Sequence, residues 1–129
     1  MRYKSYRDLE IYKKADRLMA EIHDLSLKLP IFEMYEEGRQ IRKSSKSIKS
    51  NIVEGFGRRK YKQEFMKFLI YALASCDETL NHLDTLHKTQ SLKDEGRYKS
   101  LCKEYDHLGR MITNFIRSIE SNHITKTRI

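Results

Sequence analysis

The feature that most constrains this chain is the scarcity of residues that break helices. The 129 residues include one proline, Pro30, and five glycines. A β-rich chain of this length needs more turn residues, because each reversal between strands demands special backbone angles. Apolar residues also recur at steps of three and four, which is the period of one helix face. The sequence therefore predicts an all-α protein.

The periodic segments divide into four predicted helices. Their ranges are about 8–29, 37–54, 61–89 and 92–121. Pro30 ends the first range, because the residue before a proline is pushed out of the α region, and Gly55 is expected to end the second. Ser91 followed by Asp94 resembles a capping box at the start of the fourth. Four amphipathic helices with short connections predict an up-down-up-down four-helix bundle, formed by a single domain over residues 1–129.

The distribution of positive charge is the main indication of function. The chain has 26 Lys and Arg against 18 Asp and Glu, a formal net charge of +8. Most of this excess lies between residues 36 and 62, where there are nine bases and three acids. The bases are Arg39, Arg42, Lys43, Lys46, Lys49, Arg58, Arg59, Lys60 and Lys62. Because the first five recur at helical spacing with no acid between them, they predict a basic stripe along one side of a helix. The like charges of such a stripe repel one another, and an anionic partner would relieve this repulsion.

Three interpretations of the stripe remain open. Lys and Arg bind nucleic-acid phosphates without reading sequence. Tyr3, Tyr6, Phe56 and Tyr61 lie near bases in the sequence and are able to stack on nucleobases, although such aromatic residues are more often part of helix-end packing. The same stripe also suits an acidic protein partner, and many charged runs are only solvated surface.

The sequence contains no sign of catalytic residues, a metal site or a cofactor site. The five histidines lack the H-E-x-x-H spacing of zinc hydrolases, and the paired Glu-x-x-His motifs of di-iron bundles are absent. Cys76 and Cys102 fall within helical patterns and are expected to be reduced core residues of a cytoplasmic protein. No stretch approaches the ~20 apolar residues needed to span a bilayer, so a membrane association is not expected.

One segment matches a family signature. Residues 40–58 read QIRKSSKSIKSNIVEGFGR. They resemble the pattern Q-I-R-R-A-A-x-S-I-x-x-N-I-A-E-G-x-x-R of the four-helix-bundle family, also called the large-subunit rRNA intervening-sequence protein family. Supporting matches at 6–12, 29–33, 64–69 and 108–112 extend the resemblance over about residues 6–120. Ser44, Ser45 and Val53 replace alanines of the pattern, and these small changes make the face more polar without threatening the fold.

The resemblance implies a four-helix bundle that assembles into a ring-like homopentamer in bacteria. Its members are encoded in insertions within rRNA genes or elsewhere in bacterial genomes. Proteins related in fold serve as accessory variability determinants of diversity-generating retroelements, where a basic pentamer binds nucleic acid and a reverse transcriptase. No catalytic residue transfers from the family. We therefore expect a non-enzymatic, oligomeric accessory protein that binds RNA or DNA, with an interaction scaffold for an acidic partner as the alternative.

Four residues of the signature are interpreted as structural. They are Ser47, Asn51, Glu54 and Gly55. A glutamate in the last turn of a helix opposes the helix dipole, so Glu54 is expected to have a fixed partner. Arg58 and Arg42 are the two candidates for that partner.

Overall fold

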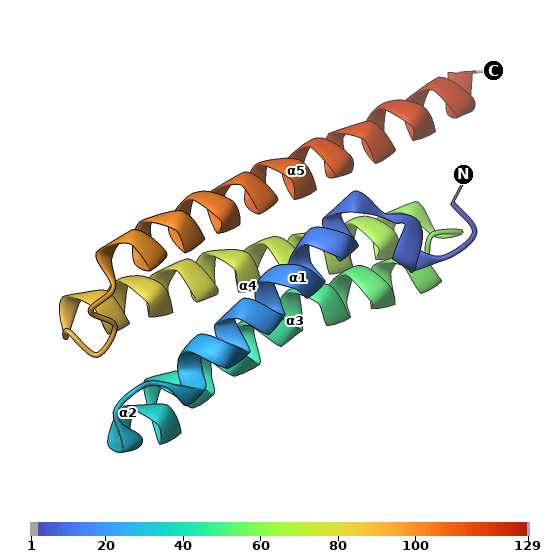
Figure 1. Ribbon diagram of the computed structural model, residues 1–129. Helices are drawn as coiled ribbons and strands as arrows, with labels where there is room; N and C mark the ends of the chain where they lie inside the picture. The colour runs from blue at the N-terminus through green and yellow to red at the C-terminus, as the bar shows by residue number, and fades with distance from the viewer. Residues whose placement is uncertain (1–2, 129) are drawn as a thin grey trace.

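Four long helices account for most of the chain. The computed structural model describes residues 3–128 and the side chains of residues 3–122. The helices are η1 (Tyr6–Asp8), α1 (Glu10–Leu27), α2 (Ile31–Tyr35), α3 (Glu37–Gly57), α4 (Lys62–Lys88) and α5 (Glu95–Arg128). The long helices run alternately in opposite directions (Figure 1), and the described part of the chain contains no strand. The predicted all-α, up-down-up-down bundle is confirmed.

The four long helices enclose one apolar core. α1 packs on α3, α3 on α4, α4 on α5, and α5 returns to α1. The fully buried core residues include Leu18, Ile22, Ile41, Ile48, Ile52, Leu69, Leu83, Leu86, Leu108 and Ile112. These positions carry the three- and four-residue spacing seen in the sequence. Because burial of one such side chain is worth roughly 1.5–3 kcal/mol, they supply most of the drive for folding.

The contact between α3 and α4 is made by small hydroxyl side chains. Ser44 and Thr79 are both buried, and their hydroxyl oxygens lie 2.8 Å apart. One turn along, the Ser75 hydroxyl donates a hydrogen bond of 2.9 Å to Ser47 Oγ. Small side chains let the two backbones approach, and paired hydroxyls avoid the cost of buried, unsatisfied polar atoms.

The contact between α1 and α5 is, by contrast, crossed by ion pairs. Glu104 Oε2 lies 3.2 Å from Lys14 Nζ and 2.9 Å from Arg17 Nη2. At the other end, Arg97 Nη2 lies 3.2 Å from Asp24 Oδ2. Hydrogen bonds from Arg17 and then Lys14 lower the pKa of Glu104. Hydrogen bonds from Lys28 and then Arg97 lower the pKa of Asp24. Both carboxylates, in their charged form, therefore stabilise the folded state.

We expect acid to weaken this contact. A carboxyl group whose pKa is lower in the folded chain stabilises the fold above its unfolded pKa of about 4, and this contribution is lost as pH falls further. Urea unfolding midpoints measured from pH 6 down to pH 2 should fall across this window. The double variant Glu104→Gln, Asp24→Asn should start lower at pH 6 and fall less steeply. Parallel curves for the two proteins would contradict this assignment.

The prediction that Gly55 ends its helix is wrong. α3 continues through Gly55 to Gly57, and Gly55 is buried. A Cβ atom at Gly55 would lie 3.1 Å from Phe68 Cβ and 3.3 Å from the Phe65 carbonyl oxygen. The glycine is required because α4 crosses α3 at this point with no room for a side chain.

Other helix boundaries also differ from those predicted. α1 ends at Leu27, and the expected connection before residue 37 contains the short helix α2. α5 begins at Glu95, where Asp94 Oδ1 accepts a hydrogen bond of 3.0 Å from the Arg97 backbone N–H. Ser91 is therefore not the capping residue. α5 also extends beyond residue 121, to Arg128.

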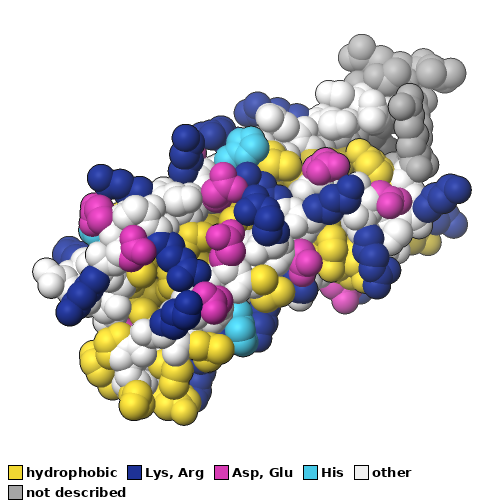
Figure 2. All heavy atoms as spheres, viewed as in Figure 1, with side chains coloured by type: hydrophobic (Ala, Val, Ile, Leu, Met, Phe, Trp, Pro, Cys, Tyr) yellow, Lys and Arg dark blue, Asp and Glu magenta, His cyan; other side chains and the backbone are white. Residues whose placement is uncertain are grey.

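Buried polar contacts hold α2 at one end of the bundle. Glu33 is buried and accepts hydrogen bonds from the Ser91 hydroxyl (2.8 Å) and the Glu37 backbone N–H (3.3 Å). Arg42 Nη2 donates to the Met34 carbonyl oxygen at 3.0 Å. With α2 fixed in this way, large apolar side chains of α1 and α2 stay in solvent. They are Leu27, Ile31, Phe32 and Tyr35. Figure 2 shows a yellow cluster at its lower left, where α2 lies in Figure 1.

Candidate nucleic-acid interface

One side of α3 presents cations that have no partner. Arg39, Lys43 and Lys46 are exposed, and none of them makes an ion pair or side-chain hydrogen bond with the described residues. Their spacing of four and three places them on one face of α3, over about 10 Å at the ordinary helical rise. No acid occurs in α3 between Glu37 and Glu54. We call these three residues the α3 basic face.

Arg42 and Lys49 lie on a different side of α3, toward α1. Arg42 Nη1 donates to Ser26 Oγ at 3.0 Å. Lys49 Nζ lies 2.7 Å from Asp16 Oδ1, and this hydrogen bond raises the pKa of Lys49. The five cations expected in one stripe therefore form two rows. One row is exposed and without partners, and the other joins α3 to α1 and α2.

The turn between α3 and α4 holds the remaining predicted bases. Arg58 contacts two acids, Glu54 at 3.6 Å and Glu64 at 3.4 Å. Arg59 donates to the Phe56 carbonyl oxygen at 2.9 Å, and its guanidinium carbon lies 4.0 Å from the Phe56 ring centre. Lys60 is exposed, while Lys62 is half-buried as the first residue of α4. Among the bases of this turn, only Arg58 is neutralised by acids in the described part of the chain.

Three of the four signature residues make contacts within α3 or between α3 and α4, and Glu54 contacts the turn after α3. Asn51 Nδ2 donates to Ser47 Oγ at 3.1 Å, and Ser47 in turn accepts from Ser75. Gly55 provides the close approach of α4. Of the two candidate partners for Glu54, Arg58 is the one in contact. This geometry supports the structural interpretation of the signature.

The four aromatic residues noted beside bases are not equivalent. Tyr3 packs on Phe115 with ring centres 6.4 Å apart, and Tyr6 packs edge-on against Tyr12 at 4.9 Å. Phe56 is buried. Tyr61 is 63% exposed, and no other aromatic ring in the described part of the chain packs on it. Packing thus accounts for Tyr3, Tyr6 and Phe56, and Tyr61 alone keeps a free ring.

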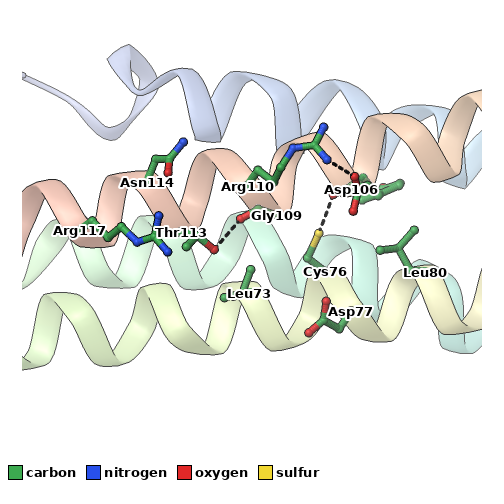
Figure 3. A pocket seen from close by; sticks show the side chains of 11 residues that line it. Leu73, Cys76, Asp77, Leu80, Asp106, Gly109, Arg110, Thr113, Asn114 and Arg117 are labelled. Carbon is green, nitrogen blue, oxygen red and sulfur yellow. Dashed lines mark hydrogen bonds and ion pairs between the residues drawn. The ribbon is translucent and has the colours of Figure 1, made fainter.

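A groove lies between α4 and α5 (Figure 3), with a volume of about 470 Å³. Its floor contains Cys76, whose thiol lies 3.2 Å from the Tyr105 carbonyl oxygen. Burial raises the pKa of Cys76 to about 12, so the thiol stays protonated and is a poor nucleophile at neutral pH. Asp106, at the rim, is paired with Arg110. This groove contains no activated catalytic group.

In the described part of the chain, neither the two cysteines nor the acidic residues form a reactive cluster. Cys76 is buried as predicted, whereas Cys102 is only half-buried; both are free. Among residues 3–122 no three His, Cys, Asp or Glu side chains come together as metal ligands. Within the described residues, no helix combines the length and the apolar character that crossing a bilayer requires.

A comparison with known proteins finds the same helical fold in a solved structure. One solved structure that matches is that of a protein of unknown function from the S23 ribosomal protein family of Bacteroides thetaiotaomicron. It superposes with a TM-score of 0.75 at 21% identity, covering 83% of this chain and 95% of that one. None of the curated proteins compared with the chain matches it. The model of the family described as 23S rRNA-intervening sequence protein matches residues 7–114. The chain, with the α3 signature and the bundle described above, therefore belongs to the 23S rRNA-intervening sequence protein family.

Proposed function

We propose that this protein is a non-enzymatic accessory protein of the cytoplasm that binds the phosphate backbone of RNA or DNA as a homo-oligomer. The observation that carries the proposal is the α3 basic face, three exposed cations in a row without an acid beside them. The exposed bases of α1 and of the residue after it differ: Lys13, Arg17 and Lys28 each pair with an acid of α1.

Unpaired cations of one sign repel each other, and this cost is relieved when phosphates bind and release their counterions. Long, flexible lysine side chains contact phosphates as point charges and read no base sequence. Binding of low sequence specificity is therefore the activity that this surface favours.

Exposed apolar side chains support self-association. One group, Leu27, Ile31, Phe32 and Tyr35, lies at the α2 end of the bundle, and a second, Ile70 and Tyr71, lies on α4. Two unlike patches on one chain favour a head-to-tail contact, which generates a ring when the rotation closes. The family resemblance suggests five subunits. A ring would repeat the α3 basic face around its axis and strengthen the field that attracts a polyanion.

The alternative is an interaction scaffold whose basic face docks an acidic protein. The α2 apolar cluster favours protein contact in general, and an acidic partner would satisfy the same cations. Polyglutamate of matched charge distinguishes the two ideas. Polyglutamate and an unlabelled oligonucleotide of equal charge are each used to displace a labelled oligonucleotide. If polyglutamate competes equally well, the acidic-protein interpretation is preferred.

The proposal is tested by the salt dependence of binding. If about three phosphates contact one chain, affinity should fall about 20- to 40-fold between roughly 50 and 200 mM salt. Fluorescence anisotropy with a labelled oligonucleotide measures this slope. Light scattering on a size-exclusion column, with absorbance at 260 and 280 nm, gives the subunit number and any retained nucleic acid. An affinity that does not change with salt concentration, or no binding at all, would overturn the proposal.

A further inference from the structure

The turn between α3 and α4 carries an exposed tyrosine ring with a lysine near it. Tyr61 is 63% exposed. Lys60 Nζ lies 5.9 Å from its ring centre. Lys62 follows it directly, and Arg59 is two residues before it. In Figure 1 this turn lies at the end of the bundle opposite α2.

The ring stands on a rigid turn. The backbone N–H of Arg58 donates to the Gly55 carbonyl oxygen at 3.0 Å, and that of Tyr61 donates to the Arg58 carbonyl oxygen at 2.9 Å. The Tyr61 carbonyl oxygen accepts from the Phe65 backbone N–H at 3.0 Å, within the first turn of α4. A tyrosine with few rotatable bonds on a backbone fixed from both sides loses little entropy when a ligand stacks on it.

The acids near the turn are already neutralised. Arg58 contacts both Glu54 and Glu64, and Lys67 Nζ lies 3.2 Å from Glu64 Oε2. Between residues 54 and 67 there are five bases and these two acids. Arg59, Lys60 and Lys62 make no ion pair in the described structure, so the turn that carries Tyr61 keeps a net positive charge.

The turn follows α3 at the end of the side that carries the α3 basic face. Gly57, the last residue of α3, lies in the same angular position on the helix as Arg39, so a strand that follows this side reaches the turn. From Arg39 to Gly57 the helix rises about 27 Å. This length suits a short single-stranded site, since such sites hold about 4–16 nucleotides.

We propose that Tyr61 is a stacking platform for an unpaired nucleobase, and that the adjoining phosphates of the same strand run along the α3 basic face. The ligand class is single-stranded RNA or DNA, and the inference rests on the nucleic-acid binding proposed above. In a duplex both faces of an interior base are covered by neighbours, so Tyr61 has nothing to stack on. In a single strand one face is free, and every base has such a face, so no sequence preference results.

The first test compares strands with duplex. Labelled oligothymidylate and oligouridylate of about 12 nucleotides, and a duplex of equal length, are titrated with the wild type, Tyr61→Ala and Tyr61→Phe. Tyr61→Ala should weaken single-strand binding roughly 5- to 100-fold and leave duplex binding unchanged, while Tyr61→Phe should retain affinity. Tyr3→Ala is the control, because Tyr3 is a partly exposed tyrosine (39%) whose ring packs on Phe115. It should bind as the wild type does.

The second test reads stacking directly. The chain contains no tryptophan, so Tyr61→Trp introduces a single reporter. Its emission should be quenched by unlabelled oligothymidylate or oligouridylate but not by duplex, whereas Tyr3→Trp should not respond. Quenching by only one of the two strands would assign the site to DNA or to RNA.

The outcomes separate this inference from the proposed function. If strand and duplex bind equally and Tyr61→Ala changes neither, the stacking site is overturned while backbone binding stands. If Tyr61→Ala weakens both alike, Tyr61 acts on the backbone or the fold, and stacking is again overturned. If the wild type binds neither probe, the proposed function itself fails.

Discussion

Replacing both Lys43 and Lys46 by glutamate is expected to lower nucleic-acid affinity on the order of 100-fold at about 0.1 M salt. Each side chain is exposed and has no partner in the described structure, so its charge is available to a phosphate. Removing each contact forfeits one released counterion, and the new carboxylate adds repulsion. Anisotropy titrations measure the loss, and circular dichroism should show an unchanged helical content.

A control variant separates local from overall charge. Lys93→Glu together with Lys103→Glu makes the same change in net charge at two exposed lysines outside α3, neither with an ion-pair partner in the described structure. This control should keep most of the affinity. An equal loss in both variants would mean that binding follows the net charge of the protein, not the α3 basic face.

Lys49 is unsuitable for such an experiment. Its ammonium lies 2.7 Å from Asp16, so a glutamate at this position would place two carboxylates together across the α1–α3 contact. The Lys49→Glu variant would lose stability as well as charge. A loss of binding in it would therefore be ambiguous.

Gly55→Val is expected to destabilise the fold by about 1–3 kcal/mol. The new side chain would begin 3.1 Å from Phe68 Cβ and 3.3 Å from a backbone oxygen of α4, so α3 and α4 must separate. Such separation would strain the nearby Ser47–Ser75 hydroxyl contact. The melting temperature should fall by roughly 4–12 °C for a domain of this size, as calorimetry or circular dichroism would record.

Gly57→Val is the matched control for this substitution. Gly57 belongs to the same helix, and a Cβ atom there would meet nothing within 4 Å. Its stability should stay within about 0.5 kcal/mol of the wild type. Equal melting temperatures for the Gly55 and Gly57 variants would refute the close approach of α4 as the reason for Gly55.

Local sequence was least informative where the meaning of a residue depends on a distant neighbour. A glycine after an amphipathic stretch is typical of a helix end, and only the crossing of α4 shows why Gly55 lies inside α3. The segment after Pro30 has no helical period long enough to reveal α2. Its position depends on Glu33 reaching Ser91, which is far along the chain. Similarly, Tyr61 differs from Phe56 in burial, which no local pattern indicates.

The sequence by itself determined the all-α bundle and the concentration of positive charge between residues 36 and 62. Both follow from local properties, because helical periodicity and composition are written in neighbouring residues. Only the tertiary structure decided which of those charges are free. Lys49 is neutralised by Asp16, and Arg42 is bound to Ser26 and Met34, whereas Lys43 and Lys46 contact no acid among the described residues. Packing of α1 against one side of α3 makes this division, because an ion pair forms only where folding brings two distant side chains within contact.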